Sequence, residues 1–90
     1  MNKPGADFRT RTINIPGVIS ELQNNLKVRL EETIKDYRNS DDLLGYMQQD
    51  LEVYKGSLEL MYNIGFIDKE LWDTETENGY MIYVDMAKTA

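Results

Sequence analysis

The sequence predicts a mostly α-helical single domain built on an antiparallel helical hairpin, and three observations support this. Apolar residues recur every three or four positions across about 17–38 and again across about 41–64, the spacing of one face of a helix. Only the short polar stretch "RNSDD" separates the two segments, and so short a connection places consecutive helices side by side and antiparallel. The 90 residues, 41% of them hydrophobic, are enough for one small domain, 1–90.

The first predicted helix, at about 17–38, has one apolar stripe and a polar back. The stripe consists of Ile19, Leu22, Leu26, Leu30, Ile34 and Tyr37. Two starts are possible for this helix. Pro16 suits a first turn because its missing N–H would have no partner there. Alternatively, Ser20 with Gln23 three residues later forms a capping box.

The second predicted helix, at about 41–64, carries two apolar stripes. The first stripe has the three-four spacing of a heptad seam and comprises Leu44, Met47, Leu51, Tyr54, Leu58 and Met61. The second stripe is rotated by roughly a third of a turn at ~100° per residue and comprises Tyr46, Val53, Leu60 and Ile64. Ser40 is the predicted N-cap of this helix, and Gly65 its left-handed C-cap.

One neighbouring helix cannot cover both stripes, so something further must contact the second one. We expect burial within the chain, beneath a third helix and the terminal segments. The alternative is a dimer or partner-binding surface. Candidate partner-binding residues are the members of the second stripe together with three aromatic side chains that suit an adaptable interface, Tyr62, Trp72 and Tyr83.

The third helix is predicted to be short, at about 68–75, with Asp68 as its cap. Asn78–Gly79 then gives the strongest turn signal in the chain. "YMIYV" at about 80–84 and "FRTRTINI" at about 8–15 are rich in residues that favour strands. These two terminal β segments would pair with each other or with the sheet edge of another protein. Residues 1–7 and 86–90 are expected to be flexible ends.

Negative charge is concentrated in the middle of the chain. The net charge is −6, yet residues 41–77 hold ten acids against two lysines. The predicted acidic surface comprises Asp50, Glu52, Glu59, Glu70, Asp73, Glu75 and Glu77. A solvated face with acids that cap helices explains most of this run, and the alternative is a mimic of nucleic-acid phosphates. The basic N-terminal segment is interpreted as an edge strand with arginine on its outer side, and the alternative is a nucleic-acid-binding arm. Its three positive charges, Lys3, Arg9 and Arg11, add too little phosphate affinity, so no direct nucleic-acid binding is expected.

The residues required for common catalytic and cofactor sites are missing. The chain has no cysteine and no histidine, and it has none of the glycine-rich or serine motifs for nucleotide binding or acyl transfer. Adjacent carboxylates occur at Glu31–Glu32 and Asp41–Asp42, but neighbours on a helix point apart. We therefore expect no enzyme, no cofactor and no metal. No segment has the pattern of a signal peptide or membrane span, so a cytoplasmic protein without a membrane partner is expected.

The segment "YKGSLELMYNIGFIDKELW", Tyr54–Trp72, resembles the pattern of a helix, a glycine and a short helix in small acidic accessory proteins encoded by phages of Gram-positive bacteria. The resemblance implies a protein that binds and blocks a bacterial host protein in the host cytoplasm, for host takeover or anti-defence. A homodimer is compatible with this function. The alternatives are an acidic decoy of a nucleic-acid-binding protein and a small virion or assembly component.

Overall fold

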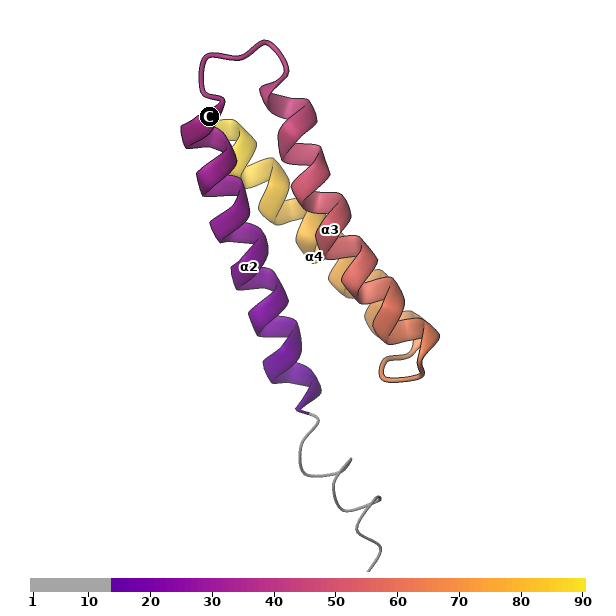
Figure 1. The fold of residues 1–90 in the computed structure, drawn as a ribbon. Helices are drawn as coiled ribbons and strands as arrows, with labels where there is room; N and C mark the ends of the chain where they lie inside the picture. Colours follow the sequence, from indigo (N-terminus) through magenta and orange to yellow (C-terminus); the bar gives the residue numbers. More distant parts are fainter. Residues whose placement is uncertain (1–13) are drawn as a thin grey trace, which may run out of the picture.

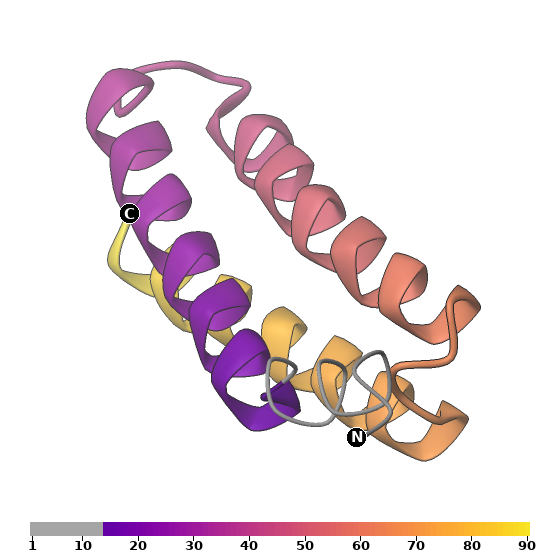
Figure 2. The same ribbon diagram turned by 60° about the horizontal axis from the view of Figure 1, so that its bottom comes forward.

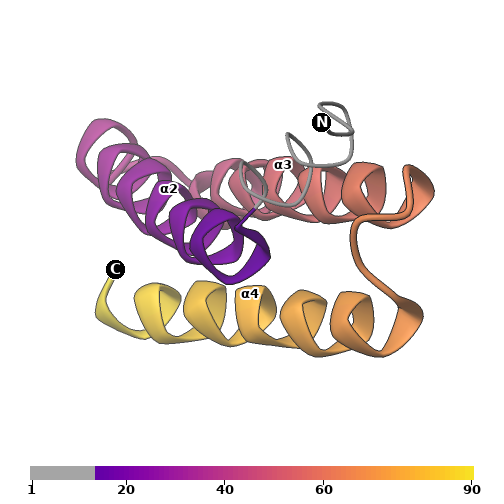
Figure 3. The same cartoon turned by 90° about the horizontal axis from the view of Figure 1, so that it is seen from below.

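The computed structural model describes residues 14–90, which form three α-helices (Figure 1). These are α2 (Ile15–Asp36), α3 (Leu43–Asn63) and α4 (Lys69–Thr89). The predicted hairpin of α2 and α3 is confirmed, and α4 then returns along both helices (Figure 2). Seen from below, α2 and α3 form one layer and α4 a second layer against them (Figure 3).

Helix α2 begins at the first of the two predicted starts. The Asn14 side chain accepts a hydrogen bond from the Gly17 N–H at 3.1 Å, and Pro16 lies in the first turn. Ser20 is therefore inside the helix. The predicted strand 8–15 is wrong at its end, because Asn14 caps α2 and Ile15 belongs to it; residues 8–13 and the expected flexible residues 1–7 lie outside the described residues.

Helix α3 begins two residues later than predicted and ends as predicted. Its N-cap is Asp42, and the Ser40 hydroxyl instead accepts a hydrogen bond from the Asp42 N–H at 3.0 Å within the preceding turn. At the other end Gly65 has a left-handed φ of 84°. The Phe66 N–H donates to the Met61 carbonyl at 2.8 Å and the Gly65 N–H to the Tyr62 carbonyl at 3.1 Å, which is a Schellman motif.

The third helix starts where the sequence predicts but is far longer. Asp68 caps it by accepting a hydrogen bond from the Leu71 N–H at 2.9 Å. The helix continues through Asn78–Gly79 and 80–84 to Thr89, so the predicted turn and the predicted C-terminal β segment are both wrong. Residues 86–89, expected in a flexible end, form its last turn, and residues 14–90 contain no strand.

A close helix–helix contact explains the misleading turn signal at Gly79. Gly79 is buried, and a Cβ atom built on it would lie 2.2 Å from Cε2 of the Tyr54 ring. The glycine therefore allows α4 to approach α3, and it does not form a turn. The apolar residues after it follow helical spacing, since Tyr83 is buried and Ile82, Met86 and Ala87 pack around the same core.

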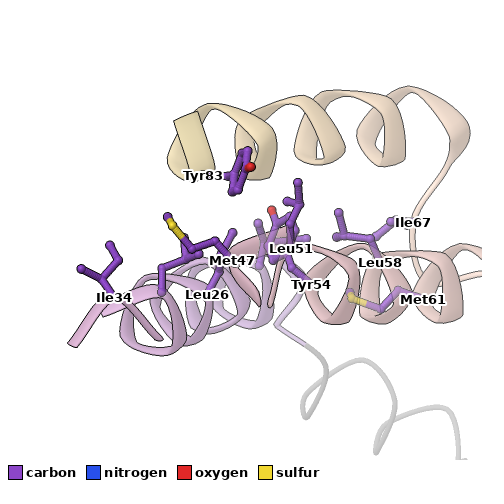
Figure 4. Close-up of a cluster of buried hydrophobic side chains, with 11 residues drawn as sticks. Leu26, Ile34, Met47, Leu51, Tyr54, Leu58, Met61, Ile67 and Tyr83 are labelled. Carbon is purple, nitrogen blue, oxygen red and sulfur yellow. The ribbon is translucent and has the colours of Figure 1, made fainter. Parts of the chain in front are cut away.

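The core lies between the two layers and contains the first stripe of α3 (Figure 4). Its buried members are Ile19, Leu26, Leu30, Ile34, Met47, Leu51, Tyr54, Leu58, Met61, Ile67 and Tyr83. Tyr83 points from α4 toward the residues of the hairpin. Leu44, predicted for the first stripe, is exposed instead. A buried Leu or Met side chain contributes ~1.5–3 kcal/mol by leaving water, so this seam is the main source of stability.

Candidate interaction surface

The second stripe of α3 is largely uncovered. Val53 is 48% exposed, Leu60 60% and Ile64 53%. The expectation that a third helix buries this stripe is wrong for these three residues, because α4 lies on another side of α3. Lys55 lines the hollow between α3 and α4, and Val53 is roughly 160° away from Lys55 at ~100° per residue.

Tyr46 differs from the other members of the second stripe, because an aromatic neighbour covers it. Its ring stacks on that of Tyr37, the C-cap of α2, with ring centroids 4.0 Å apart and an interplanar angle of 20°. Such a pair contributes ~0.5–1.5 kcal/mol beyond its buried area. The stack joins the ends of α2 and α3 at the hairpin loop, so the open part of the second stripe runs from Val53 to Ile64.

A hollow of about 310 Å³ adjoins Tyr46 at the start of α3. It is lined by Asp42, Gly45, Tyr46 and Gln49. Gly45 leaves this space open, since nothing lies within 4 Å of the position that a Cβ atom would occupy there. The lining provides a carboxylate, a side-chain amide and an aromatic ring at one end of the second stripe.

Carboxylates accompany the second stripe along the helix. Glu52 precedes Val53 and Glu59 precedes Leu60, so one acid lies beside each of these two apolar side chains. Lys55 pairs with Glu52 at 3.3 Å on the exposed surface, a contact that contributes ~0–1 kcal/mol. Within residues 14–90, Glu59 forms no ion pair. The open stripe is therefore an apolar line with an acidic margin.

The other three candidate partner-binding residues hold helices together. Tyr62 and Trp72 stack with centroids 4.5 Å apart and join the end of α3 to the start of α4, with Lys69 Nζ 5.6 Å from the Trp72 ring centroid. Both are half-buried, and Tyr83 is in the core. Tyr80 and Met81 are also exposed, and they were not among the predicted partner-binding residues because 80–84 was predicted to be a strand and not part of a helix.

The seven predicted acidic residues do not share one role. Asp50 accepts a hydrogen bond from the Thr33 hydroxyl at 2.5 Å, and Glu75 accepts one from the Gln23 amide at 2.6 Å, so both join helices. Asp73 pairs with Lys69 at 3.0 Å. The remaining four are Glu52 and Glu59 beside the second stripe, Glu70 in the first turn of α4, and Glu77 in a hollow of about 470 Å³ between α3 and α4. Several of these acids therefore have local structural functions.

One polar junction connects all three helices. The Tyr54 hydroxyl of α3 donates to the Glu75 carbonyl of α4 at 2.9 Å, and Gln23 of α2 donates to the Glu75 carboxylate. Burial raises the pKa of Tyr54 to about 12, and the negative charge of Glu75 adds to the shift. The hydroxyl is protonated at neutral pH with either pKa, and the raised pKa extends the range over which it can donate this hydrogen bond above pH 10.

Within residues 14–90 no three acidic, cysteine or histidine side chains converge as metal ligands. None of the three helices combines the length and apolarity needed to cross a bilayer. Comparisons with protein-family models, curated proteins and solved structures return no match to the chain.

Proposed function

We propose that this protein is a non-catalytic binding module that docks on a protein partner through the open part of the second stripe. One observation carries the proposal: Val53, Leu60 and Ile64 lie along one side of α3 and its C-cap and are each about half exposed. None of the three belongs to the buried core of residues 14–90 or to the partly buried residues packed against it. Rows of exposed apolar side chains with a polar margin are typical of interaction sites.

The expected binding mode places these side chains as anchors in the surface of the partner. Anchors that are buried in an interface carry most of its binding free energy, and truncating one commonly costs ~1–3 kcal/mol. The affinity would then arise mainly from apolar contacts. An acidic decoy is less well supported, because Asp50 and Glu75 are engaged in hydrogen bonds between helices.

The resemblance of Tyr54–Trp72 to phage accessory proteins supports a finer proposal about the partner. In this segment the end of α3 and Gly65 follow the pattern on which the resemblance rests, whereas α4 is a long helix and not the short one of that pattern. We propose that the partner is a bacterial host protein and that docking blocks its normal contacts.

Site-specific photo-crosslinking tests the docking surface. A photoreactive amino acid is placed at position 60, at position 64 and, as a matched control, at Val28, which is 43% exposed on the outward side of α2. In an extract of the native host we expect the same discrete protein to be captured at 60 and 64 and not at 28. An excess of unlabelled wild-type chain should prevent capture, whereas a Leu60→Ser chain should compete poorly. Capture of the same proteins at all three positions would refute the proposal, as would capture of none.

A further inference from the structure

We propose that the second stripe receives a basic amphipathic helix, in which an apolar seam is flanked by lysine or arginine. This inference rests on the proposed function and specifies the chemistry of the partner segment. It depends on three features of the described residues: the spacing of the exposed anchors, the absence of a strand edge, and the charge beside the anchors.

The spacing of the anchors favours a helix as the partner element. Val53 and Leu60 are seven residues apart, the repeat at which one helix packs along another. From Val53 to Ile64 the helix rises by roughly 16 Å, which an opposing helix spans in about three turns. Residues 14–90 offer no strand edge on which an extended segment could add. Gly56 lies between the anchors with nothing within 4 Å of its Cβ position, which leaves room for close approach.

The charges beside the anchors favour a basic partner. Glu52 and Glu59 follow the same seven-residue repeat as Val53 and Leu60, so a helix lying on the stripe would pass both carboxylates. At the Tyr46 end of the second stripe, Asp42 and Gln49 provide oxygen acceptors in the hollow described above. A long cationic side chain that enters this hollow would also contact the Tyr46 ring. Lysine or arginine beside an apolar seam would complement these groups and would select against acidic helices.

A second copy of this chain is the less suitable occupant. Residues 14–90 hold seven lysine and arginine residues against fifteen aspartate and glutamate residues, a net charge of −8. In a dimer formed through the second stripe, the acidic margin of one copy would face that of the other. Like charges in apposition oppose such an association.

The test uses the full chain and designed fluorescent peptides with helical heptads. The first peptide has leucine at both seam positions and lysine at the flanking positions. The second replaces each lysine with glutamate, and the third scrambles the first so that it has no apolar seam. Fluorescence anisotropy should show that the lysine peptide binds at least about tenfold more tightly than either of the others. Equal binding of the lysine and glutamate peptides, or of the lysine and scrambled peptides, would overturn the inference.

Variants of the chain locate the binding site. Leu60→Ser should weaken binding of the lysine peptide by roughly fivefold or more. Glu59→Gln should weaken binding of the lysine peptide but not of the glutamate peptide, from which it removes a repulsive charge. Val28→Ser is the matched control and should bind like the wild type. An unchanged affinity for Leu60→Ser would place the peptide elsewhere and overturn the inference. Light scattering could also show a dimer that Leu60→Ser dissociates. That result would overturn the inference and identify a second copy of the chain as the occupant of the stripe.

The two proposals can fail separately. If photo-crosslinking at Leu60 captures a specific protein but the lysine peptide shows no preference over its controls, the docking surface stands and its basic partner is refuted. If no protein is captured while the lysine peptide binds in a Leu60-dependent manner, the chemistry of the stripe stands and the proposed function is refuted.

Discussion

Replacing Gly79 with alanine should destabilise the bundle, although alanine is the better helix former. In a helix interior, alanine is favoured over glycine by ~1 kcal/mol. At Gly79, however, the added methyl group would lie 2.2 Å from Cε2 and 2.5 Å from Cδ2 of Tyr54. Carbon atoms pack at about 3.5–4.0 Å, so the ring or the helix must move by more than ~1 Å.

The Tyr54 ring has little freedom to make room. It is 3% exposed, and its hydroxyl donates to the Glu75 carbonyl at 2.9 Å. Overpacking of a core usually costs ~1–3 kcal/mol. Because burial and a hydrogen bond restrict the Tyr54 ring, we expect a cost in the upper part of that range. After the gain in helix propensity is subtracted, we expect Gly79→Ala to lower the free energy of unfolding by about 2 kcal/mol.

Gly56→Ala is the matched control, because Gly56 is exposed within α3 and has nothing within 4 Å of its Cβ position. This variant should gain up to about 1 kcal/mol, so the two alanine variants should differ by ~3 kcal/mol. At about 4–8 °C per kcal/mol, their Tm values would differ by roughly 12–24 °C. Urea and thermal unfolding followed by circular dichroism measure both quantities.

Equal stability of the two alanine variants would refute the reasoning. A second comparison isolates the clash itself: in a Tyr54→Leu background the aromatic carbons are absent, so Gly79→Ala should cost much less than it does beside tyrosine. An undiminished cost in that background would assign the effect to something other than the contact between Gly79 and Tyr54.

Three further predictions concern single contacts, each measured by urea unfolding. Tyr54→Phe should cost ~1 kcal/mol by removing the donor to Glu75. Because the pKa of Tyr54 rises from 10.0 to about 12 on folding, its contribution to the free energy of unfolding is present below pH 10 and is lost between pH 10 and 12. An equal decline in the stability of the phenylalanine variant over this pH range would contradict the prediction. Asp68→Ala should cost ~1 kcal/mol through loss of the cap, and Asp42→Ala, whose side chain makes no cap hydrogen bond, should cost less. Gly65→Ala should cost ~1–2 kcal/mol at its φ of 84°, and a neutral effect would rule out strain there.

Local signals predicted the end of α3 and the start of α4, because the causes of these two boundaries lie within a few residues. Gly65 can adopt the left-handed conformation that ends α3, and Asp68 satisfies an N–H group three residues ahead. The length of α4 was not predictable in this way. The reason for a glycine at position 79 is the ring of Tyr54, 25 positions earlier in the sequence, and without that contact Asn78–Gly79 has the pattern of a turn.

The candidate site was predictable in its composition but not in its exposure. The periodicity of α3 identifies both stripes. Which of them is covered depends on where the third helix packs, and α4 is long enough to lie against both helices of the hairpin. For the same reason Tyr83, a predicted partner-binding residue, lies in the core, while Tyr80, about one helical turn earlier on α4, is 53% exposed.

The junction of Gln23, Tyr54 and Glu75 selects one alignment among several that the apolar seams would permit. Leucine-rich seams repeat every seven residues, so one helix could slide past its neighbours by a heptad, roughly 10 Å, and still bury similar surface. Sliding would separate the tyrosine hydroxyl and the glutamine amide from their glutamate acceptors and place the ring of Tyr54 against a bulkier side chain than Gly79. The junction therefore favours the observed registration of the helices, and with it the direction in which α3 presents its uncovered side.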